Sequence, residues 1–162
     1  MRTLTASVCV VALFAVASGT SAARPGSQRR LEAVTPREYS LIVAINAVRT
    51  VHLLPKLGID TRLVLAARSH SHDMLRRHYF AHGNFPGRMA AFHVRLRTAG
   101  ENLAWGSGPY GQAGEVVREW LASPEHRANL LGTGFSRIGI GLARGTFLGT
   151  GDATVVTADF AG

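Results

Sequence analysis

The hydrophobic positions of the chain follow a helical period in three segments. The first segment opens with Thr35-Pro36-Arg37-Glu38, a capping box in which the threonine caps the helix and the glutamate reaches back to the cap amide. Positions expected to be buried recur every three or four residues, at Leu41, Ile45 and Val48, at Leu63, Ala67, His70 and Met74, and at Ala113, Val117, Trp120 and Leu121. We therefore predict three long helices, of which the first ends before Pro55 and the second is capped by Asp60 or Thr61.

A period of two replaces the helical period near the end of the chain. Large apolar residues at positions 138, 140 and 142 alternate with Gly139, Gly141 and Ala143, which predicts a strand with one nearly bare face that another backbone can approach closely. Further strands are predicted at 101–106 and 155–160. The Gly-, Pro- and Asn-rich segments 81–87 and 107–111 are predicted loops, 88–93 is a predicted short helical piece, and Ser123 and Pro124 open a short helix that Gly132 closes.

The order of these elements is helix, helix, strand, helix, short helix, strand, strand. Helices and strands that do not alternate one by one are typical of α+β proteins rather than of parallel α/β folds. We expect a small antiparallel sheet with helices on both of its faces. The predicted fold class is therefore α+β, in one domain that spans residues 35–162.

The first 23 residues form a predicted signal peptide. Arg2 supplies a weak positive start, residues 4–17 are apolar, and small residues follow up to Ala23. This apolar run is too short to span a bilayer comfortably, and an uncleaved N-terminal anchor is the alternative. Cleavage after residue 22 or 23 leaves 162 − 23 = 139 residues, enough for one core, with a disordered leader at 24–34. No second long apolar run follows, so we expect no transmembrane segment after cleavage.

Cysteine content and charge narrow the class of protein. The single cysteine, Cys9, lies in the predicted signal peptide, so we expect a mature chain with no disulfide and no thiolate metal site. The formal net charge is +8, which suits an exported protein that meets acidic wall polymers or anionic lipid heads. The arginines are scattered rather than arranged in a stripe with aromatic residues, so we expect no specific nucleic-acid partner.

Three residues from different segments are candidates for a shared polar site. His82 follows the second helix in a loop, Glu101 opens a predicted strand, and His126 lies in the first turn of a short helix. A carboxylate at the start of a buried strand needs a partner, and Arg88 is the structural alternative to a histidine or a metal. The positive end of a helix dipole disfavours a charged His126, and a neutral imidazole binds metals or accepts protons. Taken alone, each residue also has an ordinary interpretation, as a solvated loop histidine, a paired carboxylate or a local cap.

The other histidines and the serines give weaker signals. His70 falls on the apolar face of the second helix, and we expect it to be a core histidine with a satisfied hydrogen bond. No serine lies in a nucleophile-elbow sequence, and the chain has neither a phosphate-binding glycine loop nor a His-Glu-x-x-His motif. The remaining histidines are expected at the surface or its boundary; they are His52, His72, His78 and His93.

Seven short motifs occur in order between residues 41 and 160. They are Asn46-x-x-Arg49, Ala66-Ala67-x-x-His70-Ser71-x-Asp73-Met74, Phe80-Ala81-His82, Gly100-Glu101-Asn102-Leu103-Ala104-x-Gly106, Val116-Val117-x-x-Trp120-Leu121-x-Ser123-Pro124-x-His126-Arg127-x-Asn129-Leu130-Leu131, Ile138-Gly139-Ile140-Gly141 and Thr157-x-Asp159-Phe160. With these motifs the chain resembles the bacterial branch of the CAP superfamily, whose domain is also called the SCP domain. The resemblance implies a three-layer α-β-α sandwich around a small antiparallel sheet.

The resemblance also implies a large open cleft, lined by two histidines and, in many members, by two glutamates. His82, Glu101 and His126 match three of these positions, so we expect them to share a cleft and to be the ligands of a divalent cation such as Zn²⁺. The second glutamate has no match, since the region after Trp120 contains no carboxylate before Glu125. This departure weakens a mechanism that uses two carboxylates. The lack of cysteines also departs from the disulfide-rich eukaryotic branch.

Three functions agree with these residues. We favour a secreted, non-catalytic extracellular binding or interaction module, whose cleft holds a polar ligand or a divalent cation. The first alternative is a metal-assisted, peptidase-like hydrolase, in which His82 and His126 hold Zn²⁺ and Glu101 completes the ligand set or activates water. The second alternative is a lipid-binding protein that uses a groove between helices. The expected partner is a cell-wall polymer, a lipid or another protein outside the cell.

Overall fold

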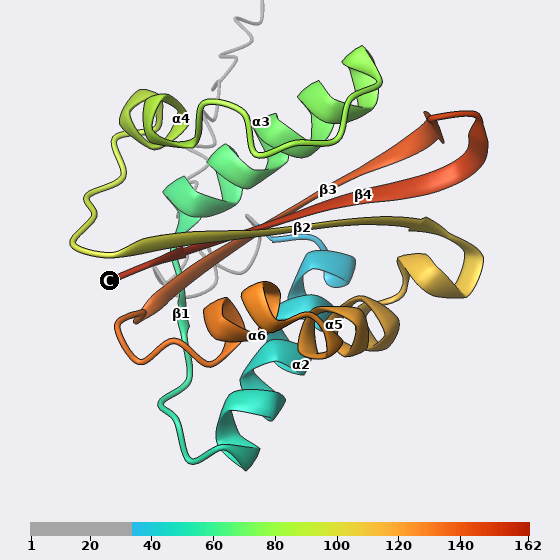
Figure 1. Ribbon diagram of the computed structural model, residues 1–162. Coiled ribbons are helices and arrows are strands. Elements are labelled where there is room, and N and C mark those ends of the chain that lie inside the picture. The colour runs from blue at the N-terminus through green and yellow to red at the C-terminus, as the bar shows by residue number, and fades with distance from the viewer. Residues whose placement is uncertain (1–33) are drawn as a thin grey trace, which may run out of the picture.

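A four-stranded sheet separates the helices into two layers (Figure 1). The computed structural model describes residues 34–162. One face of the sheet is covered by α3 (Thr61–Arg77) and the short α4 (Phe85–Ala91). The other face is covered by α2 (Pro36–Val51), α5 (Ala113–Ala122) and α6 (Pro124–Leu130). The chain is therefore an α-β-α sandwich of class α+β, as predicted.

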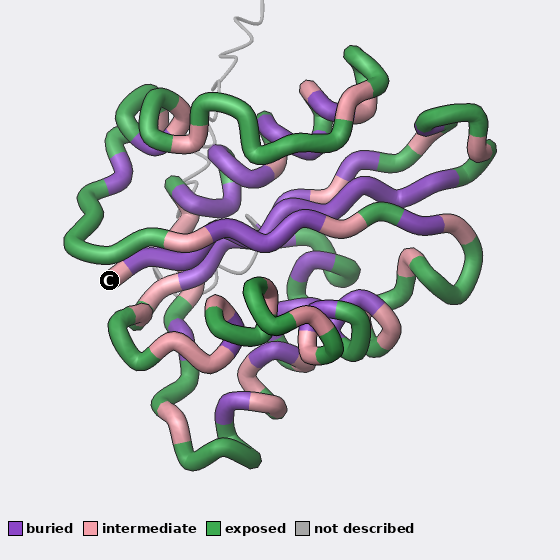
Figure 2. The backbone as a smooth tube through the Cα atoms, in the orientation of Figure 1, coloured by how far each residue is buried: buried purple, intermediate pink, exposed green. Residues whose placement is uncertain are grey.

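The strands lie side by side in the order β1-β3-β4-β2. The long strands β3 (Arg137–Phe147) and β4 (Thr150–Ala161) form a hairpin, and β2 (Ala99–Ser107) pairs antiparallel with the other side of β4. The two-residue β1 (Gly58–Ile59) runs parallel to β3, which is an exception to the antiparallel sheet that we predicted. Figure 2 shows that the central strands are buried along most of their length.

The bare face of β3 is the place where α3 packs. A side-chain carbon added to Gly139 would collide with the backbone of Leu63 and Val64, and one added to Gly141 would collide with the backbone of Ala67 and Arg68. These glycines therefore let the helix rest directly on the strand backbone. The close approach that the alternating pattern predicted is confirmed.

The predicted core is also confirmed. The sheet divides the buried apolar residues, so that the largest cluster lies chiefly among the sheet, α2 and α5, whereas Leu63 and Met74 belong to smaller clusters. Trp120 is 1% exposed, and its Nε1 donates to the carbonyl oxygen of Leu103 at 2.9 Å. Three of the positions expected to be buried are half-buried and pack against the largest cluster; they are Val48, Ala113 and Leu121. The residues that we predict to form the core are all buried, namely Leu41, Ile45, Leu63, Ala67, Met74, Val117, Trp120, Ile138, Ile140, Val156 and Phe160.

The starts of the first two helices follow their sequence signals. In α2, the amide of Glu38 donates to Thr35 Oγ1 at 3.3 Å and the amide of Thr35 donates to Glu38 Oε2 at 2.7 Å, which completes the predicted capping box. Arg68 of α3 forms an ion pair with the same glutamate, so the cap also joins the two helices. Asp60 caps α3 by accepting from the amide of Arg62 at 2.9 Å.

Two predicted loops contain helical turns. α4 begins at Phe85, because Asn84 Oδ1 accepts from the amide of Gly87 at 3.0 Å and Pro86 suits a first helical turn. We read Pro86 and Gly87 as helix breakers, and the predicted loop is therefore wrong for residues 85–87. A single 3₁₀ turn, η1 (Gly108–Gly111), likewise lies inside the second predicted loop.

The described part of the chain begins at Val34, the last residue of the predicted leader. Val34 is 8% exposed and packs in the largest apolar cluster. The predicted signal peptide, residues 1–23 with Cys9, lies outside the described residues. None of the helices within residues 34–162 combines the length and the apolar character that crossing a membrane requires.

Candidate functional site

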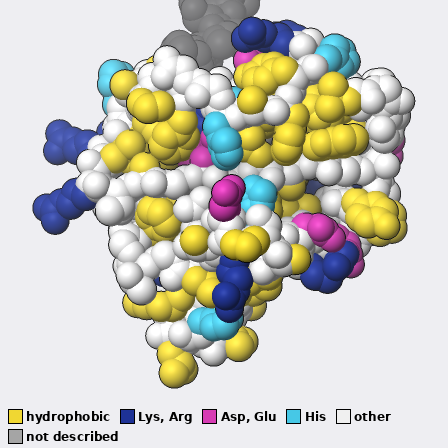
Figure 3. Space-filling view, viewed as in Figure 1, with side chains coloured by type: hydrophobic (Ala, Val, Ile, Leu, Met, Phe, Trp, Pro, Cys, Tyr) yellow, Lys and Arg dark blue, Asp and Glu magenta, His cyan; other side chains and the backbone are white. Residues whose placement is uncertain are grey.

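The three predicted site residues come from segments that meet beside β2. His82 lies in the loop between α3 and α4, Glu101 lies in β2, and His126 lies in the first turn of α6. His82 Nδ1 is 2.7 Å from Glu101 Oε1, and the charge of His82 helps to lower the pKa of His126. The two imidazoles are therefore neighbours that approach β2 from opposite layers. Figure 3 shows histidine and acidic side chains close together near the centre of this face, among hydrophobic ones.

Glu101 is buried between a histidine and an arginine. Its second carboxylate oxygen forms an ion pair with Arg88, whose Nη2 also lies 3.4 Å from Asp159 Oδ1. Asp159 is the register partner of Glu101 on β4. The carbonyl of Glu101 accepts a hydrogen bond from Asn129 and so points away from β4. Glu101 and Asp159 are therefore a non-hydrogen-bonded antiparallel pair, the kind in which the two side chains lie closer together. Both partners that the sequence suggested for Glu101, a histidine and Arg88, therefore bind it together.

The guanidinium group of Arg88 pairs with two buried carboxyl groups, those of Glu101 and Asp159. Burial raises the pKa of Glu101 to about 7, against the opposing effects of Arg88 and Asp159. Burial also raises the pKa of Asp159 well above its ordinary value; the positive charge of Arg88 opposes this rise, and the negative charge of Glu101 adds to it. Asp159 is fully buried, so we assign the retained proton at neutral pH to Asp159. The pair then carries one negative charge, which Arg88 balances.

A further histidine holds the loop that carries His82. His70 is 4% exposed, and its Nε2 lies 3.0 Å from the carbonyl oxygen of Ala81. Burial, together with the charge of Arg88, lowers the pKa of His70 to about 4, so this imidazole is neutral at pH 7 and donates to Ala81. The predicted core histidine is confirmed. The other histidines expected at the surface are exposed, namely His52, His72, His78 and His93.

Two asparagines fix α6, and with it His126, against β2. Asn102 Nδ2 donates to the carbonyl oxygen of His126 at 3.0 Å, and Asn129 Nδ2 donates to Asn102 Oδ1 at 2.8 Å. An added side-chain carbon at Gly100 would lie 2.6 Å from Asn129 Oδ1, so the glycine makes room for this contact. Since successive strand residues face opposite sides, Glu101 and Asn102 serve different layers. Asn102 therefore supports the backbone of His126 rather than its ring.

His126 is half-buried at the start of α6. Its pKa is lowered first by burial and then by the charge of His82. The adjoining cap residue, Ser123, is at the predicted position but makes no capping hydrogen bond. We predicted a neutral His126 from the helix dipole. The direction of the shift is confirmed, whereas its leading cause is burial.

The fit of a metal ion is limited by the partners of Glu101. Within residues 34–162, no three histidine, cysteine or acidic side chains are grouped to hold a metal ion. One oxygen of Glu101 faces His82 and the other faces Arg88. A metal held by His82, Glu101 and His126 stays a prediction, and it requires Glu101 to leave Arg88.

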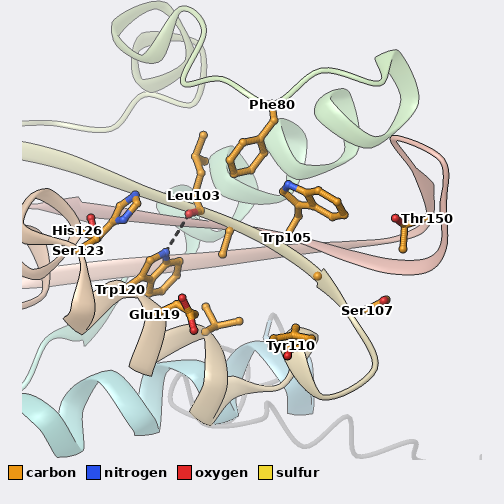
Figure 4. Close-up of a pocket in the computed structure, with 13 residues that line it drawn as sticks. Phe80, Leu103, Trp105, Ser107, Tyr110, Glu119, Trp120, Ser123, His126 and Thr150 are labelled. Carbon is orange, nitrogen blue, oxygen red and sulfur yellow. Dashed lines mark hydrogen bonds between the residues drawn. The ribbon is translucent and has the colours of Figure 1, made fainter.

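An open cavity of about 670 Å³ lies beside His126, along β2 (Figure 4). Phe80 and Trp105 line one side of it, and Glu119 and Trp120 from α5 line the other, next to His126. The buried ring of Phe147 supports the first pair, with ring centroids 6.5 Å from Phe80 and 5.3 Å from Trp105. The remaining lining residues are Leu103, Ala104, Gly106, Ser107, Tyr110, Val116, Ser123 and Thr150.

The cavity follows the edge of β2 that no described strand covers. Two carbonyl oxygens on this edge are occupied by side chains, because Asn129 donates to Glu101 and Trp120 donates to Leu103. Trp105 follows Leu103 by two residues in β2, and the β2–β4 pairing is regular between them. The backbone N–H and C=O of Trp105 therefore point to the same edge. A ligand in the cavity thus meets both unpaired backbone groups and aromatic rings.

The aromatic half of the cavity and its acidic residue were not predicted from the sequence. The available signal was a tryptophan, Trp105, in a predicted strand, and only the structure shows that its side chain is 37% exposed. Glu119 lies off the apolar face of α5, is exposed, and lines the cavity. A carboxylate is therefore supplied by α5, although it precedes Trp120 rather than following it.

Most of the described part of the chain is similar to known sequences. Residues 42–160 match the model of the CAP family, described as the cysteine-rich secretory protein family. The chain is 36% identical over 113 residues to the protein YkwD, and 33% identical over 115 residues to the membrane protein YlbC, both of Bacillus subtilis (strain 168). These alignments cover 67% and 68% of this chain but 43% and 32% of the relatives, so the chain spans less than half of their length.

The chain is similar to solved structures as well. An extracellular protein containing an SCP domain from Bacillus anthracis str. Ames has a TM-score of 0.66 and 27% identity, over 79% of this chain and 44% of that one. An outer surface protein from Borrelia burgdorferi has a TM-score of 0.62 and 22% identity, over 84% and 96% of the two chains, which shows a shared fold. Since the family match runs from α2 to β4, the chain belongs to the CAP family, the cysteine-rich secretory protein family.

Proposed function

We propose that this chain is a secreted, non-catalytic binding module whose β2 cavity takes a ligand with an apolar body and polar groups. The lining of the cavity carries this proposal, because aromatic rings face Glu119 and His126 across it. A concave site of this size, with mostly apolar walls and a few polar groups, is typical of small-ligand sites. The apolar part of the ligand would lie on Phe80 and Trp105, and its polar part would lie near His126.

The surroundings of Glu101 support binding rather than hydrolysis. A general base must reach its proton directly or through one water. Glu101 is 8% exposed and is already bound by His82 and Arg88. We therefore expect no cleavage of a mixed protein substrate such as casein beyond that produced by the Glu101→Gln variant. Cleavage that this substitution abolishes would favour the peptidase-like alternative instead.

The ligand proposal is tested with N-phenyl-1-naphthylamine, an uncharged apolar dye. The chain has two tryptophans, of which Trp105 is 37% exposed in the cavity and Trp120 is 1% exposed. Dye bound in the cavity should quench Trp105 by energy transfer. We expect Trp105→Ala to weaken dye binding by about tenfold, which is about 1.4 kcal/mol. Tyr39→Ala is the control, because Tyr39 is an exposed aromatic residue of α2 outside the cavity. Equal effects of the two substitutions would reject the site.

We also propose that Zn²⁺ binds weakly between His82 and His126. While Arg88 holds Glu101, the chain offers two protein ligands, fewer than the three of a catalytic zinc site. Binding should weaken as the pH falls, because only neutral imidazoles bind the metal. Titration calorimetry on the native chain, His82→Ala and His126→Ala tests this, with the exposed His52→Ala as control. Equal affinity in all four proteins would place the ion elsewhere.

A further inference from the structure

We propose that a second cavity, on the α3 side of the molecule, binds a phosphate ester. This cavity has a volume of about 510 Å³ and lies between the C-terminal half of α3 and the loop that leads to α4. Figure 1 shows this loop running back alongside α3. We call it the arginine pocket, and it is lined by Ser69, His70, His72, Asp73, Arg76, Arg77, Tyr79, Gly83, Asn84 and Arg88. It shares no lining residue with the β2 cavity.

The charge of the arginine pocket is strongly one-sided. Its lining has three guanidinium groups, two imidazoles and a single carboxylate, that of Asp73. The acidic group is neutralised within the pocket, because Arg76 Nη2 lies 2.6 Å from Asp73 Oδ1 and Arg77 Nη1 lies 3.2 Å from Asp73 Oδ2. Tyr79 donates its hydroxyl hydrogen to Asp73 Oδ2 at 2.8 Å. Since Glu101 and Asp159 already balance Arg88, the net positive charge that an incoming anion meets comes from Arg76 and Arg77, which together exceed Asp73 by one charge.

The same contacts hold the two exposed arginines in place. Asp73 binds both guanidinium groups, and the Arg77 guanidinium lies over the ring of Tyr79 at 5.2 Å from its centroid. The side chains of Arg76 and Arg77 are nevertheless 75% and 66% exposed, so donors remain for a ligand. Arg76 and Arg77 lie in the last turn of α3, where the helix dipole favours positive charges. The dipole accounts for two cations at this helix end, but it does not account for the cavity around them.

Arg88 forms the inner wall of the pocket. Its side chain is 9% exposed, and its Nε is buried without a hydrogen-bond partner in the described part of the chain. Its other nitrogens face Glu101 and Asp159, which ties the wall to the sheet. The pocket therefore combines a polar inner wall with two exposed arginines, held by Asp73, at its mouth.

These features suit an anionic ligand such as a phosphate rather than an apolar one. Guanidinium groups present several N–H donors in a planar fork that fits phosphate oxygens. The hydroxyl of Ser69 and the amide of Asn84 lie on the same lining and supply neutral donors for an attached sugar or glycerol. A volume of about 510 Å³ exceeds that of a bare phosphate, so we assign the pocket to a phosphate ester of a small polyol.

Such an ester occurs free in solution or as a lipid headgroup, and two arms of one experiment separate these sources. The purified full chain is titrated with glycerol 3-phosphate by calorimetry, and it is sedimented with vesicles of phosphatidylcholine with or without phosphatidylglycerol. We expect saturable binding in at least one arm. Binding in the calorimeter would identify a soluble ester, and binding only to phosphatidylglycerol vesicles would identify a headgroup. The absence of binding in both arms would overturn the proposal.

Matched variants separate the pocket from diffuse surface charge. The double variant Arg76→Gln/Arg77→Gln should lower the affinity at least tenfold. The control Arg118→Gln/Arg144→Gln removes two exposed, ion-paired arginines elsewhere and should change it less than twofold. Equal losses in the two double variants would mean that only the net charge matters, and would overturn the pocket.

A second substitution leaves every arginine in place. Asn84→Asp keeps the cap of α4, because aspartate caps a helix as well as asparagine does, but it adds a negative charge to the pocket. We expect a fivefold or larger loss of affinity with an unchanged far-UV spectrum. Gln112→Glu, which makes the same neutral-to-acidic change at the start of α5, should have little effect. Unaltered binding by Asn84→Asp would also overturn the proposal.

Discussion

At the scale of single residues, the pair of Glu101 and Asp159 governs how the site responds to pH. Both groups have a raised pKa, so the folded chain holds their shared proton more tightly than the unfolded chain does. By linkage, their contribution to stability is largest at low pH and is lost as the pH rises from the ordinary carboxyl pKa, 4.5 for glutamate, to about 7. His70 acts with the opposite sign, because its pKa is lowered from 6.5 to about 4, and its contribution is lost as the pH falls through that range.

We expect the Asp159→Asn variant to gain stability relative to the native chain as the pH rises from 5 to 8. Asparagine resembles protonated aspartate in shape and does not titrate, so the variant escapes the loss that ionisation causes in the native pair. The expected change is on the order of 1–3 kcal/mol. Urea unfolding of both proteins at the two pH values measures this difference in the free energy of unfolding. The contribution of His70 is present in both proteins and therefore cancels from the difference. If the free energies of unfolding of the two proteins differed by the same amount at pH 5 and at pH 8, the shared proton would be contradicted.

Trp120 is the single side chain whose removal should cost most. It is 1% exposed, and its indole nitrogen donates to the carbonyl of Leu103 on the open edge of β2. We expect Trp120→Ala to lower the free energy of unfolding by about 3–5 kcal/mol. Trp105→Ala should cost less than half as much, because Trp105 is 37% exposed. Denaturant melts measure both, and a loss below about 1 kcal/mol for Trp120→Ala would show that it is not a core residue.

The sequence predicted some of these residues and not others, for a physical reason. His82, Glu101 and His126 stand in recognisable local contexts, such as a loop after a helix or the first turn of a new one. Asp159 belongs to one of the seven motifs and to a predicted strand, but no local feature indicates its partner. Its role depends on the register of β4 against β2, which joins residues far apart in the sequence. The arginine that balances the pair was foreseen only as an alternative partner of Glu101.

At the scale of elements, the long periodic segments were predictable and the short ones were not. α2, α3, α5 and β3 repeat their pattern over ten or more residues, so the period is clear. β1 has two residues and cannot show a period. α4 depends on one side chain, Asn84, that turns a loop-like sequence into a capped helix. β1 is thus decided by its pairing with β3, a contact that the rest of the fold supplies, whereas α4 is decided by a local cap.

The contact of α3 with β3 gives an element-scale prediction. Gly139→Ala should destabilise the chain by about 2 kcal/mol or more, because the new methyl group meets backbone atoms of α3 that cannot move aside alone. Gly114→Ala is the matched control, since Gly114 lies in the first turn of α5 with nothing within 4 Å of the added carbon. The control should be neutral or stabilising by up to about 1 kcal/mol. Similar unfolding midpoints for the two variants would contradict the close packing.

At the scale of the whole molecule, the layered architecture followed from the order of elements, whereas the cavity did not. An α+β order with amphipathic helices leaves few arrangements other than a sheet covered on both faces. The β2 cavity joins Phe80, Trp105 and Glu119, which come from three separate segments. Their meeting depends on sheet order and on how α5 crosses β2, and no local pattern encodes either. The arginine pocket differs, because all its lining residues lie between Ser69 and Arg88, on α3 and the segment that follows it.

Export is the remaining expectation for the whole chain. This expectation rests on the predicted signal peptide. We expect the secreted protein to begin at Ala23 or Arg24, because small residues follow the apolar segment there. Intact-mass measurement of protein from the culture medium checks this. A mass that still includes residues 1–17, or protein found only inside the cell, would contradict it.

Because β4 lies between β2 and β3, the sheet cannot be completed before β4 has been translated. β4 spans Thr150–Ala161, so it is translated after every other described element, yet both β2 and β3 pair with it. A nascent chain that ends at Gly149 already contains five helices from α2 to α6, but β2 has no neighbour to pair with. Translation at about 5–20 residues per second then leaves the chain unfolded for several seconds. If the predicted signal peptide directs export, this interval is when the unfolded chain would enter a translocation channel.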